Sequence, residues 1–135
     1  MAKATKTKIL SFTLPNKVGQ LAAAAELVSA AKLQVTAFCA ADMGNSAEFL
    51  VLTDKNVKAA KALASLGVEI KEEDVLAVQM SNKPGRLAKM ARKLADAGVN
   101  IRRSWATAYS GKTATCVIQT SDDAKALAAL KPKKK

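Results

Sequence analysis

The stretch SNKPGRLAKMARKL, residues 81–94, places Asn, Lys, Pro and Gly directly before an amphipathic helical pattern. A related stretch, PNKVGQLAAAAEL, occupies residues 15–27. Sliding the sequence along itself by 66 residues brings Asn16 onto Asn82 and Gly19 onto Gly85, and after one inserted residue Thr53 meets Thr120. The chain therefore contains an internal repeat, and the repeated unit decides the fold.

Both repeats show the same order of strand-like and helix-like segments. Alternating apolar residues predict strands, and apolar residues at every third or fourth position predict helices. In the first repeat this predicts strands over 8–14, 33–41, 47–53 and 68–70, with helices from Val18 to Ala31 and from a cap at Asp54 to Gly67. In the second it predicts strands over 74–80, 99–109 and 112–120, a turn at Ser110–Gly111, and helices from Pro84 to Gly98 and from Ser121 or Asp122 to about Leu130.

This order predicts an α+β fold of two ferredoxin-like βαββαβ units in tandem. Residues 1–72 form the first unit, 73–130 the second, and 131–135 (KPKKK) a basic tail. Because no strand-like segment follows the last helix, the second unit lacks its last strand and leaves a sheet edge for another strand or a partner. A unit of roughly 65 residues has a marginal core, so we expect the two units to pack together and the chain to form a homodimer.

The repeated loop joins a strand end to a helix start. Helix N-termini carry unpaired backbone N–H groups and a partial positive charge, which suit a carboxylate or phosphate. Gly19 and Gly85 allow a close approach, and Asn16 and Asn82 offer a donor and an acceptor for a zwitterion. Asn-x-x-Gly before a helix is also a good helix start without any ligand, so a purely structural loop stays open as an alternative.

A strand followed by Asn-Lys-Pro-Gly-Arg-Leu at a helix start, within a duplicated βαββαβ unit, resembles the ACT domain. The resemblance covers residues 7 to 130 and implies a regulatory, non-catalytic module that binds a free amino acid at clefts between units. Val18 stands where the second repeat has Pro84, so the two loops are not equivalent, and we favour the second. Carried over by position, the ligand-binding residues are Asn16, Lys17, Val18, Gly19, Gln20 and Leu21, and Asn82, Lys83, Pro84, Gly85, Arg86 and Leu87.

The amino-acid composition argues against several classes of function. The 135 residues include no His, the commonest general base and metal ligand. The two cysteines, Cys39 and Cys116, make no zinc pattern. We predict no catalytic site, metal or cofactor. With no apolar run long enough for a membrane span or a signal peptide, we expect a cytoplasmic protein that does not bind a membrane.

The formal charge of +11 opens a second hypothesis, a basic nucleic-acid-binding protein. Lysines and arginines recur along two predicted helices, at Lys55, Lys58 and Lys61 and at Arg86, Lys89 and Lys93. Such runs usually form a solvated helix face, and no aromatic residues interleave with them. We therefore place amino-acid binding first, nucleic acid second, and a regulatory subunit docked on a separate target enzyme as a third possibility compatible with the first.

Overall fold

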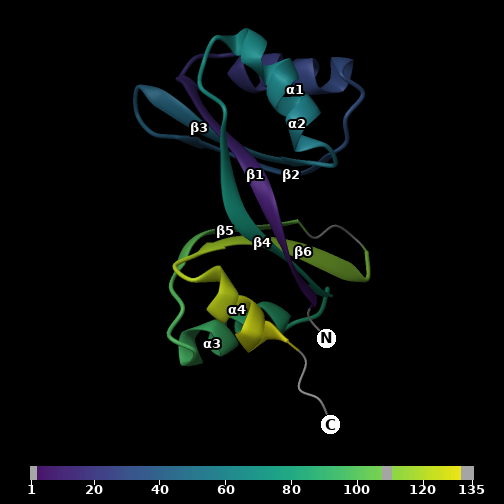
Figure 1. The fold of residues 1–135 in the computed structure, drawn as a ribbon, viewed down its shortest axis with the longest axis vertical. Coiled ribbons are helices and arrows are strands. Elements are labelled where there is room, and N and C mark those ends of the chain that lie inside the picture. The colour runs from purple at the N-terminus through teal and green to yellow at the C-terminus, as the bar shows by residue number, and fades with distance from the viewer. Residues whose placement is uncertain (1–2, 108–110, 132–135) are drawn as a thin grey trace. The chain divides into compact units, whose positions relative to one another are not determined.

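The computed structural model describes residues 3–107 and 111–131. Within them, the strands hydrogen-bond in the order β2-β3-β1-β4-β6-β5, and helices accompany each half of the chain (Figure 1). The prediction of an α+β fold is confirmed. The elements are β1 (Lys3–Pro15), α1 (Gln20–Ala30), β2 (Val35–Asp42), β3 (Ser46–Thr53), α2 (Asn56–Leu63), a 3-10 turn (Ala64–Leu66), β4 (Lys71–Ser81), α3 (Arg86–Asp96), β5 (Ile101–Thr107), β6 (Thr113–Thr120) and α4 (Asp123–Leu130).

The chain divides into two compact units, each treated below by itself. The first unit is Lys8–Glu73, and the second contains Asp74 onward together with the N-terminal segment up to Thr7. The predicted division into 1–72, 73–130 and 131–135 follows the sequence repeat, whereas the described residues Lys3–Thr7 group in space with the second repeat. Of the predicted basic tail, residues 132–135 lie outside the described residues.

The core of the first unit lies between its helices and one face of its sheet. Strand β3 pairs antiparallel with both β1 and β2. Phe12 and Phe49 are partners in the β1–β3 register, and their rings stack at 5.2 Å between centroids. Apolar side chains of α1 and α2, including Val28 and the fully buried Leu63, pack against this face. The apolar periodicity of the sequence accounts for this layer, because alternate strand residues point to one side.

The second unit repeats this layer with β4 and β5 paired antiparallel to β6 and with α3 and α4 over its core. The Thr5 hydroxyl donates to the Ala77 carbonyl at 3.3 Å, and Ala4 packs against the same core. Through Lys131, no strand follows α4 in the part of the chain that the structure describes. The N-terminal segment of β1 thus lies beside β4, at the sheet edge that the sequence alone leaves open.

Some element boundaries differ from the predictions. Strand β1 starts five residues earlier than predicted, and 68–70 forms no strand, since β4 begins at Lys71. The prediction that Asp54 caps α2 is wrong, because the capping position is Lys55. The Asp54 carboxylate instead accepts a hydrogen bond from the backbone amide of Gln34. Asp122 does cap α4, accepting from the Lys125 amide at 3.0 Å. The predicted turn residue Ser110 lies outside the described residues.

Candidate ligand-binding site

Both repeated loops end in a glycine that starts the following helix in the left-handed conformation. Gly19 has φ of 92° and Gly85 has φ of 86°, which glycine adopts without strain. Neither helix start has a side-chain capping bond or an acidic residue in its first turn. The positive ends of α1 and α3 are therefore not neutralised by a local carboxylate, as an anion site at a helix start requires.

The asparagine of each loop ties the loop to the hairpin turn of its own unit. The side-chain amide of Asn16 donates to the Gly44 carbonyl at 3.0 Å, and its backbone amide donates to the Asn45 carbonyl. Asn82 makes the matching bonds to the carbonyls of Gly111 and Lys112. The side-chain amide group that was expected to bind a ligand thus donates to the hairpin turn instead. The asparagines therefore hold the loop in place and position the site.

The twelve predicted residues fall into two separate sets, one in each unit. Ten of them are exposed, while Gln20 and Arg86 are half-buried. The Gln20 side chain donates to the Pro15 carbonyl at 2.9 Å, which adds a second bond across the first loop. Within each unit the structure thus brings the loop, the helix start and the hairpin turn together.

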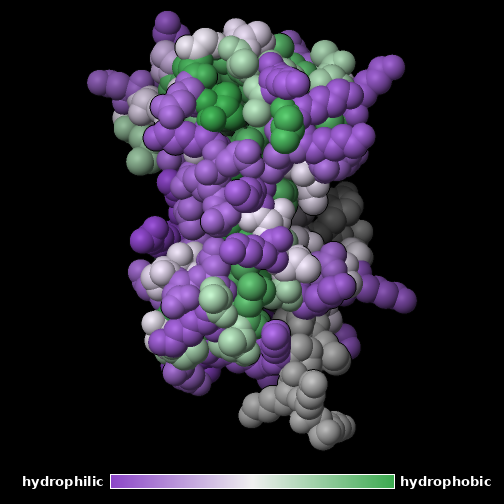
Figure 2. All heavy atoms as spheres, in the orientation of Figure 1, coloured by the Kyte–Doolittle hydropathy of each residue, from purple (hydrophilic) through white to green (hydrophobic). Residues whose placement is uncertain are grey.

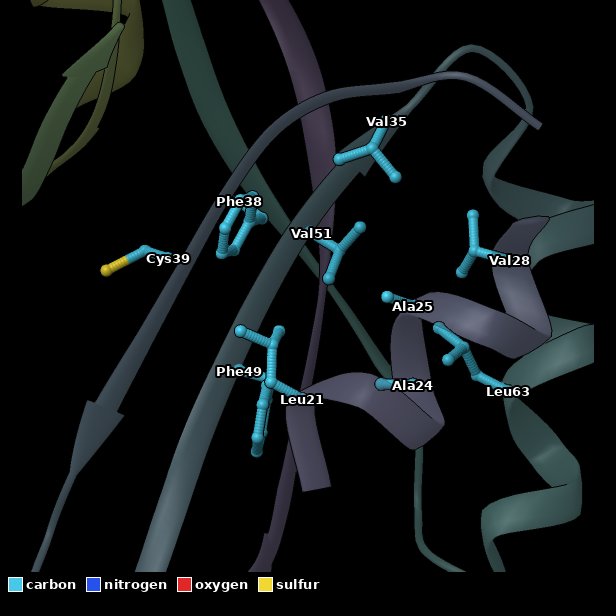
Figure 3. A pocket seen from close by; sticks show the side chains of 10 residues that line it. All are labelled: Leu21, Ala24, Ala25, Val28, Val35, Phe38, Cys39, Phe49, Val51 and Leu63. Atoms are coloured by element: carbon cyan, nitrogen blue, oxygen red, sulfur yellow. The ribbon is translucent and has the colours of Figure 1, made fainter. Parts of the chain in front are cut away.

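The first unit also contains an apolar pocket of about 300 Å³, which the sequence patterns did not predict. It lies between α1 and the strands β2 and β3, with one residue of α2 at its wall (Figure 3). Leu21 belongs both to the predicted loop residues and to this pocket. The pocket is lined by Leu21, Ala24, Ala25, Val28, Val35, Phe38, Cys39, Phe49, Val51 and Leu63.

The two repeats place side chains of different size around their cores. By the 66-residue repeat, Ala24 and Val28 of α1 correspond to Met90 and Leu94 of α3. Met90 and Leu94 are buried and fill the second core. On the sheet side the difference is reversed, because the paired Phe12 and Phe49 stand where the second unit has the paired Val78 and Cys116. This exchange of large and small side chains between helix and sheet is the sequence difference that accompanies the pocket.

Residues 5–133 match the family described as "ACT domain pair". The chain belongs to this family. The match takes up nearly all of the 135 residues, so this stretch holds no separate catalytic domain. The resemblance drawn from the repeated loop and the element order is confirmed.

Solved structures share the fold over nearly the whole chain. Protein BT0572 from Bacteroides thetaiotaomicron is 29% identical with a TM-score of 0.86, over 94% of this chain and 88% of that one. The regulatory subunit of aspartate kinase from Thermus thermophilus, in a ligand-free form, is 19% identical with a TM-score of 0.66 over 95% and 93%. The corresponding subunit from Thermus flavus is 21% identical with a TM-score of 0.64 over 96% and 92%. Comparison with curated proteins finds no significant match.

The two units of the ACT pair differ sharply in charge. Residues 8–73 contain seven Lys or Arg and seven Asp or Glu, whereas residues 1–7 and 74–135 contain fifteen and four, so the second unit carries the entire net charge of +11. Most of the large exposed apolar side chains, in contrast, lie in the first unit. Val18, Leu21, Phe38, Met43 and Val57 lie in the first unit and only Leu87 in the described part of the second, and Figure 2 shows apolar residues at the surface between polar ones.

The remaining candidates for chemistry are few. Cys39 is half-buried at the pocket, and Cys116 is buried in the second core, where desolvation raises the pKa of its thiol. Among the described residues, no group of three or more Cys, Asp or Glu side chains is arranged to hold a metal ion. None of the helices in the described ranges has the length and apolar character that crossing a membrane requires.

Proposed function

We propose that this ACT domain pair is a regulatory protein that binds a free amino acid. The observation that carries the proposal is the repeated loop: in each ACT domain it presents a left-handed glycine and an uncapped helix start, held by an asparagine to the adjacent turn. Family membership and fold support a regulatory role, because solved structures of the same fold include regulatory subunits.

The ligand's carboxylate would accept hydrogen bonds from the first backbone N–H groups of the helix. A helix dipole contributes only about 0.3–2 kcal/mol, while micromolar binding needs about 8 kcal/mol. Additional contacts are therefore required, from the residues around the loop and from a facing unit or a second copy of the chain. We accordingly propose a homodimer, and we place it in the cytoplasm.

Thermal unfolding in the presence of each of the twenty amino acids tests this proposal. A ligand that binds only the folded state raises the unfolding temperature, by mass action. We expect at least one amino acid to do so at millimolar concentration, and a Gly19→Ala, Gly85→Ala double variant to lose part of the shift. Unchanged unfolding temperatures with all twenty, together with no heat in calorimetric titrations, would refute amino-acid binding.

A second candidate role is the docking of an acidic macromolecule on the second unit, supported by the segregation of charge described above. Helix α3 contributes Arg86, Lys89, Arg92 and Lys93 against one acidic residue, Asp96, which lies 3.6 Å from Arg92. The partner is either nucleic acid or an acidic face of a regulated enzyme. Filter binding to DNA and RNA at increasing salt separates these, since phosphate contacts produce a steep loss of affinity with salt.

A further inference from the structure

We propose that the apolar pocket of the first unit receives the side chain of the ligand and so selects a branched or aromatic amino acid. This inference rests on the proposed amino-acid binding and adds the class of ligand. It concerns the hollow between α1, β2 and β3, a place within one ACT domain that the loop residues by themselves do not define (Figure 3).

The residues that line the pocket determine which ligand groups can bind in it. Nine of the ten lining residues are Leu, Ala, Val or Phe, and the tenth is Cys39. A polar group buried among such side chains would lack hydrogen-bond partners and bind unfavourably. The volume of about 300 Å³ is ample for a leucine, methionine or phenylalanine side chain, since a dry apolar cavity of about 150 Å³ already binds benzene.

The rim of the pocket connects it to the repeated loop. Leu21 lines the pocket and is the second residue of α1, directly after the uncapped helix start at Gly19 and Gln20. Leu21 is 47% exposed and Phe38 54% exposed, so these two side chains border an opening to solvent. An amino acid whose carboxylate lies at the helix start can therefore direct its side chain past Leu21 into the hollow.

The second unit provides the means to close the pocket. Met90 and Leu94 fill its core at the positions of Ala24 and Val28. The substitutions Ala24→Met and Val28→Leu enlarge two side chains that line the hollow, so that the added atoms occupy part of its volume. Ala22→Met adds the same side chain to an exposed position of α1 outside the pocket and serves as the matched control.

Isothermal titration of the full chain tests this assignment with two sets of amino acids. The apolar set is leucine, isoleucine, methionine and phenylalanine, and the comparison set is glycine, serine, aspartate and lysine. We expect only the apolar set to bind, Ala24→Met and Val28→Leu each to weaken this binding by about tenfold or more, and Ala22→Met to leave it unchanged. Circular dichroism and unfolding temperature identify folded variants, and either pocket variant alone suffices.

The failures of the two proposals are distinguishable. Binding of a polar amino acid that persists in Ala24→Met would overturn the pocket assignment and leave amino-acid binding intact. Absence of binding by all twenty amino acids would overturn both.

Discussion

The side-chain amide of Asn16 donates to the carbonyl oxygen of Gly44 at 3.0 Å, across 28 positions of sequence. This bond links the first loop to the β2–β3 turn, and Asn82 repeats it with Gly111 in the second unit. The shared geometry of the two copies within one chain gives the asparagine a structural role in addition to any contact with a ligand.

Replacing Asn16 by Ala should lower the free energy of unfolding by about 0.5–1.5 kcal/mol, because one hydrogen bond is lost at an exposed position. Chemical denaturation measures this difference. Asn45→Ala is the matched control, since Asn45 receives the Asn16 backbone amide through its own backbone carbonyl, which alanine retains. Equal stability of the two variants would show that the Asn16 side chain does not hold the loop.

Gly19→Ala should destabilise the chain by about 1–2 kcal/mol, because φ of 92° is unfavourable for a residue with a Cβ. No heavy atom outside the adjacent residues lies within 4 Å of the place that the alanine methyl group would occupy, so the cost comes from the backbone and not from a clash. Gly19→Asn should cost less, since asparagine tolerates this conformation. Thermal unfolding of the two variants side by side tests the order, and a steric cause would reverse it.

Met90→Ala should destabilise the second unit by about 2–5 kcal/mol, because it opens a cavity in a filled core. Met90 is 3% exposed and packs within that core. Leu87→Ala on the same helix is the control, since Leu87 is 58% exposed and should cost far less. Urea denaturation followed by circular dichroism provides the comparison, and similar losses for both variants would contradict this packing.

Asp122→Ala should cost about 1 kcal/mol of stability through loss of the α4 cap, while Asp122→Asn should be nearly neutral, because asparagine caps helices equally well. The Asp122 carboxylate accepts from the Lys125 amide. Unfolding temperatures of both variants check the prediction. If both substitutions were equally harmful, the charge rather than the capping bond would be the stabilising feature.

The two thiols should differ in their response to pH. Burial raises the pKa of Cys116, so its thiolate forms at higher pH in the folded chain than in the unfolded one. As pH rises above the ordinary thiol pKa, the unfolded state loses this proton first and the folded state loses stability. Cys116→Ser should remove that part of the alkaline destabilisation, and a colorimetric thiol reagent should label Cys39 in the folded chain and Cys116 only on unfolding.

Much of the molecule could be predicted from short-range patterns. The repeated Asn-x-x-Gly loops, the α1 and α3 helices that follow them, and the β3 and β6 strands all depend on local preferences of Gly, Asn, Pro and apolar periodicity. Those features led to the ACT family and to the Asp122 cap. The same local preferences gave a wrong prediction at Asp54. Its carboxylate accepts from the Gln34 amide, twenty residues away in sequence, and local patterns do not reveal such a distant partner.

The sequence by itself determined the duplication, the two glycine loops and the order of elements except for the strand expected over 68–70, because these follow from neighbouring residues. Only the tertiary structure decided that Lys3–Thr7 joins the second unit and that α1 leaves a pocket against β2 and β3. Both depend on which distant segments meet and how well their side chains fill the space between them. Periodicity identifies the face of a helix that is buried, but the volume left beneath that face is set by the partners it meets.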